Sequence, residues 1–513
     1  MRKLTKAELS RLLFLYKTDK RIAEALGVRT QLVTYWRAKK KIPKLSLLKY
    51  SKIKIKELWE RWGEDEKAGE ELGITAGAFY KWRRKYGILE RPKVLKYQQL
   101  EFSFSSPAGS STHTLIQKIL ASKAGSQTVE TNENIEIEPD WVILNQNLNF
   151  LMEELQNLGS QKISSPHKII ILLPHFNPEG NNFSYLNFKK LLKEHKIRNI
   201  FASQEGLAFQ TVVENKMVSP YQLTAALDPE FSALGGLGIL NININNNSLT
   251  EFLNQGKISL TVPETVKVNL SGTLAEGIFA KDISLFLSAK LKGPNFAGKG
   301  FEFCGPVIEK LPVKERMTLC QQVSSGNIFC SVVPCDATVK KYLSAPYSKS
   351  FNFVLADAQA EYSAKLDLEL SWLEPQIGIV GSEVEVRPLA KVKKHKISWA
   401  ILGASTDSNL EDLEIAAKIL KGRKIPKEVK MAVIPGSKAV YLSALKKNLI
   451  KTFLQAGCLF LYPGSNSFNF FEDDKIISTF NWNLSKQQLY LASPATVTAS
   501  ALKGKIADPR EFL

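Results

Sequence analysis

One short pattern occurs twice near the amino terminus, and this duplication limits that part of the chain to a small helical unit used two times. Residues 19 to 43 match residues 65 to 89 when the sequence is shifted by 46 positions. The identical pairs are Asp19 and Asp65, Glu24 and Glu70, Leu26 and Leu72, Gly27 and Gly73, Trp36 and Trp82, Arg37 and Arg83, Lys39 and Lys85, and Ile42 and Ile88. We therefore place one copy at residues 1–48 and the second at residues 49–100.

Each copy is expected to form a helix, a short turn and a second helix. In the first copy the helices are expected at residues 21–26 and 29–37. Gly27 lies between them, where the chain leaves a helix in a left-handed conformation that penalises a β-carbon. Val28 follows, and its apolar side chain is expected to fill the angle between the helices. The region is thus predicted to be a small all-α tandem of helix-turn-helix units.

The pattern I-A-x-x-L-G-V-x-x-x-x-V-x-x-W-R resembles the helix-turn-helix of bacterial DNA-binding proteins, in which the second helix enters the major groove. Helical periodicity turns four polar side chains outward, and we predict that they read base edges: Thr30, Gln31, Thr34 and Tyr35. The second copy has Ala76 and Gly77 at the matching positions, so it is expected to hold phosphates instead. The predicted phosphate contacts are Arg29, Arg37, Lys39, Lys40, Lys81, Arg83, Arg84 and Lys85.

The distribution of charge agrees with this interpretation. The whole chain carries a formal net charge of +19, and residues 1–100 hold 26 Lys and Arg against 11 Asp and Glu. A segregated basic module is typical of a protein that binds the phosphate backbone, because each cation near a phosphate releases condensed counterions. Double-stranded DNA is therefore the expected partner. A helical protein-interaction module is the alternative for the same segment.

A Ser-rich stretch at residues 101–112 indicates a linker between this region and the rest of the chain. Beyond it, apolar β-type runs at residues 168–173, 266–270 and 430–434 alternate with amphipathic helical patterns. The helical patterns fall at residues 186–195, 410–420 and 439–447. This alternation predicts stacked α/β units.

A series of short motifs in this body resembles, in order, the large subunit of 3-isopropylmalate dehydratase and homoaconitase, members of the aconitase family. The motifs are LIQKIL at 115–120, VPETVKV at 262–268, AKD at 280–282, FEF at 301–303, ERMT at 315–318, LEPQ at 373–376, LEDL at 410–413, KGRK at 421–424, IPGS at 434–437 and ASPA at 492–495. The resemblance implies aconitase-like stacked α/β/α domains, with domains 1 and 2 at residues 113–395 and domain 3 at residues 396–513.

Enzymes of this family are hydro-lyases that use a 4Fe-4S cluster held by three cysteine thiolates. The first thiolate belongs to a G-S-C-T-N motif, which corresponds here to residues 403–407, and the other two belong to a C-x-x-C after a proline. Ser405, Ser465 and Phe468 therefore occupy the three ligand positions. We expect no cluster, no other metal and no cofactor, because a serine hydroxyl is a poor ligand for this iron and phenylalanine is none.

Other motifs of the family are altered as well. His175 and Asp228 are the remnants expected in proton transfer, while Asn409 and Trp482 stand where the resemblance implies arginines that clamp substrate carboxylates. We take one set of residues as a candidate pocket for a small carboxylate effector: His175, Asp228, Arg316, Ser405, Asp407 and Ser437.

These patterns favour a catalytically inactive aconitase-like protein that acts as a DNA-binding transcriptional regulator. One alternative is a hydro-lyase with an altered, cluster-free site. The other is a scaffold that pairs with a small subunit, an active paralogue or itself. Residues 1–6 are basic but no signal-peptide stretch follows, and apolar runs such as residues 169–173 are too short to cross a bilayer. We therefore expect a cytoplasmic protein without a membrane span.

Overall fold

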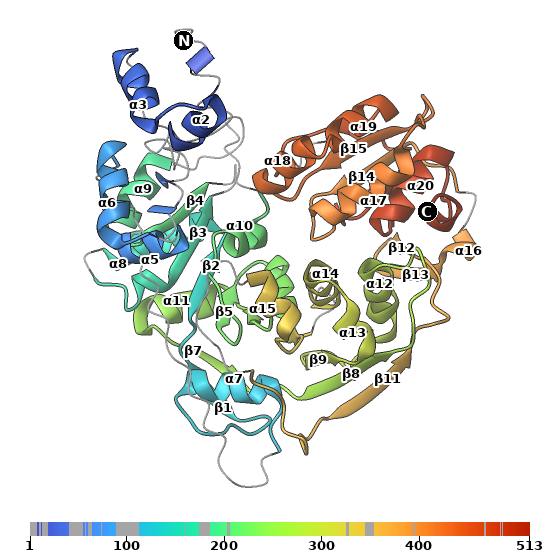
Figure 1. Cartoon of the computed structure of the whole chain (residues 1–513). Helices are drawn as coiled ribbons and strands as arrows, with labels where there is room; N and C mark the ends of the chain where they lie inside the picture. The colour runs from blue at the N-terminus through green and yellow to red at the C-terminus, as the bar shows by residue number, and fades with distance from the viewer. Residues whose placement is uncertain are drawn as a thin grey trace. The chain divides into compact units, whose positions relative to one another are not determined.

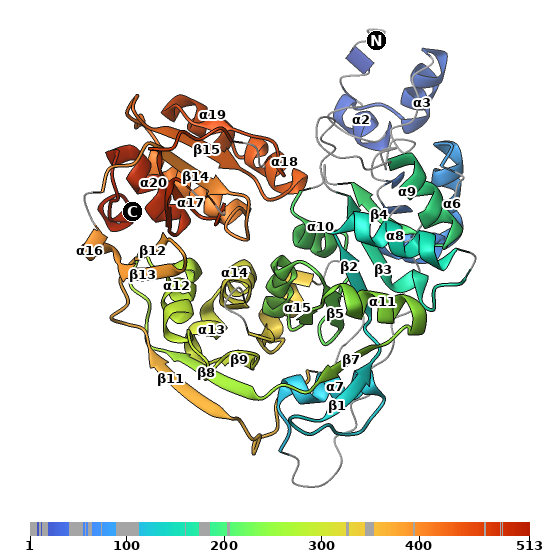
Figure 2. The same ribbon diagram turned by 180° about the vertical axis from the view of Figure 1, so that it is seen from behind.

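The computed structural model divides the chain into two compact units, Met1–Ser103 and Phe104–Leu513 (Figures 1 and 2). It describes residues 8–9, 12, 19–40, 55–56, 58–59, 64–72, 74–88, 112–159, 161–173, 185–202, 206–324, 328–343, 353–392, 395–465, 468–482, 484 and 486–513. Among these residues no helix is long and apolar enough to cross a membrane. The predicted linker lies outside the described residues except for Thr112, and the finer domain boundaries stay predictions.

The first unit contains two helix pairs. The bounds are α2 (Asp19–Leu26) with α3 (Thr30–Lys39), and α5 (Asp65–Glu71) with α6 (Ala76–Lys85). Gly27 joins the first pair with a φ of +63°, the left-handed value expected at that turn. Each pair has its own small core, in which Trp36 packs on one set of apolar residues and Trp82 on the other.

An internal ion pair is repeated in both helix pairs. Arg37 Nε lies 3.0 Å from Asp19 Oδ1, and the side chain of Arg37 is 8% exposed. At the matching positions Arg83 Nη2 lies 2.9 Å from Asp65 Oδ2, again with an 8% exposed arginine side chain. The guanidinium of Arg83 also lies 3.6 Å from the centre of the Trp59 ring. The duplicated Asp and Arg therefore fix the angle of the second helix in each copy.

We predict that Arg83→Met loosens the second helix pair by about 2 kcal/mol, because it leaves Asp65 without its charged partner in a half-buried site. Hydrogen exchange of residues 65–85 in the full-length protein should accelerate accordingly. Arg84→Met is the matched control, since Arg84 is exposed on the same helix. Equal exchange in both variants would contradict a structural role for the pair.

The second unit begins with helix α7 (Leu115–Ala124) and an antiparallel pair of strands, β1 (Asn134–Ile137) and β7 (Ile258–Thr261). Its first large sheet is parallel and has the order β4-β3-β2-β5-β6. The strands are β2 (Trp141–Leu144), β3 (Ile169–Leu173), β4 (Asn199–Ala202), β5 (Leu223–Ala226) and β6 (Leu240–Asn243). The associated helices are α8 (Leu148–Leu158), α9 (Tyr185–Glu194), α10 (Ala208–Glu214), η4 (Pro229–Leu237) and α11 (Asn246–Gln255).

A second parallel sheet has the order β10-β9-β8-β11. Its strands are β8 (Thr265–Ser271), β9 (Gly300–Cys304), β10 (Cys330–Val332) and β11 (Ala364–Glu369). Helices α12 (Ala280–Lys290), α13 (Pro306–Lys310) and α14 (Val313–Ser324) lie on one face of it, and α15 (Ala337–Leu343) follows β10 (Figure 1). We call each large sheet with its helices a layer, numbered in the order of the sheets. Helix α14 of the second layer also packs against η4 of the first, so these two layers are in contact.

The third sheet has seven strands in the order β13-β12-β18-β17-β14-β15-β16. The strands are β12 (Gln376–Val380), β13 (Val384–Pro388), β14 (Trp399–Gly403), β15 (Lys430–Ile434), β16 (Leu459–Phe460), β17 (Lys475–Ser478) and β18 (Gln488–Leu491). Strands β14 to β18 run parallel to one another, whereas β12 pairs antiparallel with both β13 and β18. This sheet therefore reaches across the boundary predicted at residue 395. Its helices are α16 (Leu389–Val392), α17 (Leu410–Leu420), α18 (Lys438–Lys446), α19 (Leu449–Ala456) and α20 (Pro494–Lys503).

Buried runs such as Ile169–Leu173 explain these sheets, because a parallel strand covered on both faces needs apolar side chains on both. The mixed α/β body with parallel sheets flanked by helices, and the partly helical amino-terminal region, confirm the predicted fold class in its coarse form.

Candidate functional site

Several residues singled out in the sequence meet at the carboxyl end of the third sheet. Strands β17, β14, β15 and β16 are parallel neighbours, so the segments that follow them lie along one edge. Ligands of open α/β sheets bind at this kind of edge. The residues brought to it are Ser405, Asp407 and Asn409 after β14, Ser437 after β15, Ser465 and Phe468 after β16, and Trp482 after β17.

Local capping fixes the first two of these segments. The side chain of Asn409 accepts hydrogen bonds from the backbone of Glu411 and Asp412, which begins α17. Ser437 accepts one from Val440 and begins α18. Gly403 ends β14 with a φ of +118°, and a β-carbon there would lie 2.0 Å from the carbonyl oxygen of Ile434. Only glycine allows the two strands to approach so closely at this point.

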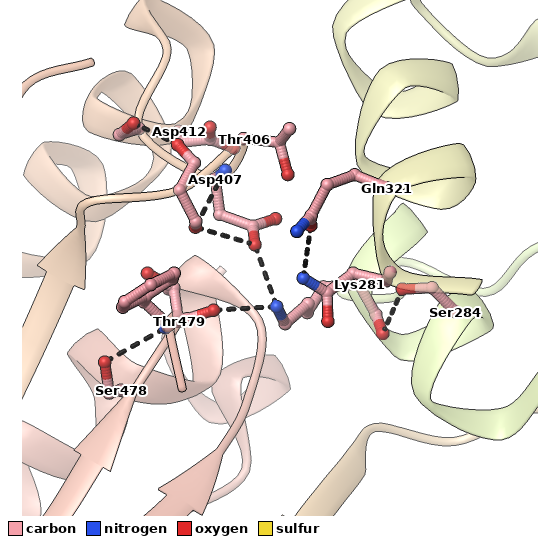
Figure 3. Close-up of polar contacts among 12 residues, drawn as sticks. Lys281, Ser284, Gln321, Thr406, Asp407, Asp412, Ser478 and Thr479 are labelled. Atoms are coloured by element: carbon pink, nitrogen blue, oxygen red, sulfur yellow. Dashed lines mark hydrogen bonds and ion pairs between the residues drawn. The ribbon is translucent and has the colours of Figure 1, made fainter. Parts of the chain in front are cut away.

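A buried lysine from the second layer reaches this edge. Lys281, at the start of α12, places its Nζ 2.7 Å from the carbonyl oxygen of Thr479 and 3.1 Å from Asp407 Oδ2 (Figure 3). The Lys281 side chain is 1% exposed. Ser405 Oγ donates to the same Asp407 oxygen over 3.3 Å. An ammonium so deeply buried is tolerated because it is both ion-paired and hydrogen-bonded.

Three further carboxyl groups surround this ion pair, and burial raises the pKa of each. The pKa of Asp282 rises to about 7, although its oxygens accept hydrogen bonds from the backbone of Phe279 and Gln376. The pKa of Glu315 is raised, and that of Asp412 is raised well above its usual value, with Asp407 as a second cause for both. The raised pKa values favour the neutral forms, so fewer negative charges accumulate around Lys281 and Asp407.

Phe468 and Trp482 are in contact with each other. The resemblance implies a cluster thiolate at the first of these positions and a substrate arginine at the second. The rings of Phe468 and Trp482 meet edge to face with their centres 5.2 Å apart. Phe468 also contacts Trp399 and stacks on Phe470. The indole of Trp482 donates to Ser478 Oγ over 2.9 Å. Aromatic packing thus fills the place where the resemblance implies charged and metal-binding groups.

The cysteines do not fit a cluster at this edge. Cys304 lies on β9, Cys320 on α14, Cys330 on β10, Cys335 after β10 and Cys458 before β16. Burial raises the pKa of Cys320, Cys335 and Cys458 to about 12. A cysteine binds cluster iron as its thiolate, and burial disfavours the thiolate form at these three positions. Ser405, Ser465 and Phe468 offer no thiolate at the edge, so the donor set there does not fit a 4Fe-4S cluster, and the described residues contain no group of three or more His, Cys, Asp and Glu that could hold a metal.

A second polar cluster lies at the carboxyl ends of β2 and β5, which are parallel neighbours in the first sheet. Asp228 accepts hydrogen bonds from Asn145 Nδ2 at 2.6 Å, Gln146 Nε2 at 2.5 Å and the backbone of Glu230 at 2.9 Å. Burial, and then the charge of Asp228, raise the pKa of Glu230 well above its usual value. Sequence analysis identified Asp228 and missed the other three, although all four directly follow strands or open η4.

One predicted pocket residue, Arg316, is placed elsewhere, and its assignment to the pocket is corrected. Arg316 is fully buried in α14, where Nη1 lies 2.8 Å from Asp336 Oδ2 and Nε donates to the carbonyl oxygen of Leu311. It is a structural residue and is not available to an effector. Ser437 Oγ donates to Glu214 Oε1 over 2.6 Å and joins the first layer to the third. His175 lies outside the described residues.

In the first unit, the structure separates the predicted nucleic-acid contacts into two groups. Arg37 and Arg83 are bound to internal aspartates, so we withdraw them as phosphate contacts. Thr34 Oγ1 donates to Asp19 Oδ2 over 2.9 Å and is held in the same way. The remaining residues are exposed except for half-buried Lys40: Arg29, Thr30, Gln31, Tyr35, Lys39, Lys81, Arg84 and Lys85.

Comparison with known proteins identifies the body. The family model described as "Aconitase family (aconitate hydratase)" matches residues 175–504. The chain is 30% identical over 423 residues to a 3-isopropylmalate dehydratase large subunit of Archaeoglobus fulgidus, covering 78% of this chain and 99% of that protein. It is 28% identical over 416 residues to one from Methanopyrus kandleri, with the same coverage. The chain belongs to the aconitase family, whose hydro-lyases are its homologues.

Among solved structures, the aconitase X of Thermococcus kodakaraensis in its holo-form aligns with a TM-score of 0.39 and 12% identity. The alignment covers 67% of this chain and 83% of that one.

We predict that Asp282 makes the body less stable as the pH rises. Its pKa is higher in the folded state than in the unfolded chain, so its contribution is complete below pH of about 4 and is lost as the pH rises to about 7. The free energy of unfolding, measured against pH, should fall less steeply over this range in Asp282→Asn. The amide of the variant places its own N–H group against one backbone N–H, and this lowers the stability equally at every pH. The slope of the free energy of unfolding against pH is therefore the quantity that tests the prediction. An unchanged slope would contradict the prediction.

Proposed function

We propose that the body is a hydro-lyase of the aconitase type whose site works without an iron-sulfur cluster. The contact between Phe468 and Trp482 carries this proposal, because two positions that would hold a thiolate and a carboxylate clamp now pack against each other. Ser405 supports it, since its hydroxyl is engaged by Asp407 and offers no thiolate. The homologous enzymes supply the substrate class, small hydroxy-carboxylic acids.

The cluster around Asp228 offers an acid and a base for such a reaction. Asp228 accepts hydrogen bonds from three donors, and we assign to its side chain the role of the base that takes the proton from a carbon atom. Burial favours the protonated form of Glu230, so we assign to it the role of passing a proton to a leaving hydroxyl group. Loss of the carbon-bound proton and of the hydroxyl as water leaves a carbon–carbon double bond. Paired carboxyl groups with divergent environments commonly divide acid and base roles in this way.

We predict that protein supplied anaerobically with iron and sulfide gains no visible absorption from a bound cluster. Dehydration of 3-isopropylmalate, homocitrate or citrate should be insensitive to an iron chelator.

Glu230→Gln should lower the rate of this dehydration about a hundredfold, because an amide cannot donate the same proton. Ser465→Ala is the control and should retain the rate. Incorporation of a cluster would contradict the proposal, and no turnover on any substrate would favour the second candidate.

The second candidate is a DNA-binding regulator with an inactive body. The charge of the first unit favours it, since residues 1–100 contain 26 Lys and Arg against 11 Asp and Glu. Exposed cations remain on both second helices after the buried arginines are withdrawn, with Arg29 and Lys39 at α3 and Arg84 and Lys85 on α6. A small carboxylate bound by the body would be its effector.

We predict that the full-length protein binds duplex DNA with a steep dependence on salt. Arg84→Ala should lower the slope of log affinity against log salt by about one, because one phosphate contact is lost. Lys446→Ala removes an exposed charge from α18 of the body and should leave the slope unchanged. Equal slopes in all three proteins would place the binding site outside the first unit.

A further inference from the structure

A surface groove of about 560 Å³ lies on the first helix pair. Its lining comes from the turn and from one side of α3: Gly27, Val28, Arg29, Gln31, Leu32 and Tyr35. Val28 and Leu32 are half-buried and form an apolar floor, while Arg29 and Gln31 are exposed at the rim. Tyr35 is 56% exposed, so its ring is accessible to a ligand. The groove therefore joins an apolar floor and an aromatic wall to a cationic rim.

The second helix pair serves as an internal comparison. The two copies share the residues that hold the frame, including the Asp–Arg ion pair and the packed tryptophan. They differ at the groove. Gln31, Leu32 and Tyr35 correspond to Gly77, Ala78 and Lys81, none of which can form the same walls. The frame is retained in both copies, and the groove is a feature of the first.

The side chains around Tyr35 indicate an anionic, flat occupant. The ammonium of Lys39 lies 5.6 Å from the centre of the Tyr35 ring and 3.5 Å from its hydroxyl oxygen. Arg29 supplies a second cation in the lining of the groove. Proteins that bind single strands combine cations that follow the backbone with aromatic rings on which bases stack. A base inside a duplex is already stacked on its neighbours and cannot enter such a groove.

We propose that this groove binds one unpaired nucleobase, stacked on Tyr35, with the adjoining phosphates held by Arg29 and Lys39. The inference rests on the nucleic-acid binding put forward above as the second candidate, and it names single-stranded nucleic acid as the preferred partner of the first helix pair. Thr34, which a helix lying in the major groove would use to read a base edge, is already bound to Asp19. That contact is consistent with a different mode of recognition.

The test uses the full-length protein and two fluorescein-labelled probes, a DNA single strand of mixed sequence and the same strand annealed to its complement. Binding is followed by fluorescence anisotropy at one low salt concentration. The single strand should bind more tightly, and Tyr35→Ala should weaken its binding by about ten- to hundredfold. Tyr35→Phe keeps the ring and should bind like the unaltered protein. Lys81→Ala, at the matching position of the second copy, should weaken both probes slightly and alike.

The outcomes separate this inference from the function on which it rests. If the duplex binds as tightly as the single strand, or if Tyr35→Ala weakens both probes equally, the groove is not a base pocket although nucleic-acid binding stands. If neither probe binds, both ideas fail. Hydrogen exchange of residues 30–39 guards against a folding effect, and it should be unchanged in Tyr35→Ala because that side chain is largely exposed.

Discussion

The ion pair between Lys281 and Asp407 connects the second layer of the body to the third. Its ammonium comes from the first turn of α12, whereas its acceptors follow β14 and β17. Neither charge could remain buried alone, since removal of one partner from such a pair typically costs about 3 to 5 kcal/mol. The segments that follow β14 and β17 in the third sheet are therefore held against α12, a helix of the second layer. The orientations of Ser405 and Thr479 follow from this contact, and burial raises the pKa of the surrounding carboxyl groups.

The rings of Phe468 and Trp482 fill the region where the resemblance implies a cluster thiolate and a substrate arginine. Together the two rings pack with Trp399 and Phe470 and join the apolar cluster on one side of the third sheet. The replacements are therefore mutually compatible, and the sheet edge is closed by dispersion and aromatic contacts in place of ionic ones. In the cluster-free proposal, acid–base chemistry depends on the first sheet.

The duplicated helix pairs separate a structural requirement from a surface role. An aspartate at the start of the first helix and an arginine near the end of the second recur in both copies, and both arginines are buried. Residues on the outer side of the second helix diverge, with Tyr35 in one copy and Lys81 in the other. A frame that does not depend on its exposed residues allows them to change without loss of the fold.

The sequence by itself determined the duplicated helix pairs, the α/β body and its family, and it predicts the replacement of the three cluster ligands. These properties follow from periodicity, from the spacing of motifs and from side-chain chemistry, all of which are local. It placed Arg37, Arg83 and Arg316 on functional surfaces, because an arginine in a basic segment or a conserved-looking motif gives no sign of whether it is buried. It also missed Lys281 and Glu230. Only the tertiary structure decided these roles, because burial and pairing depend on partners that the fold brings from distant positions, as in Lys281 with Asp407 and Asn145 with Asp228.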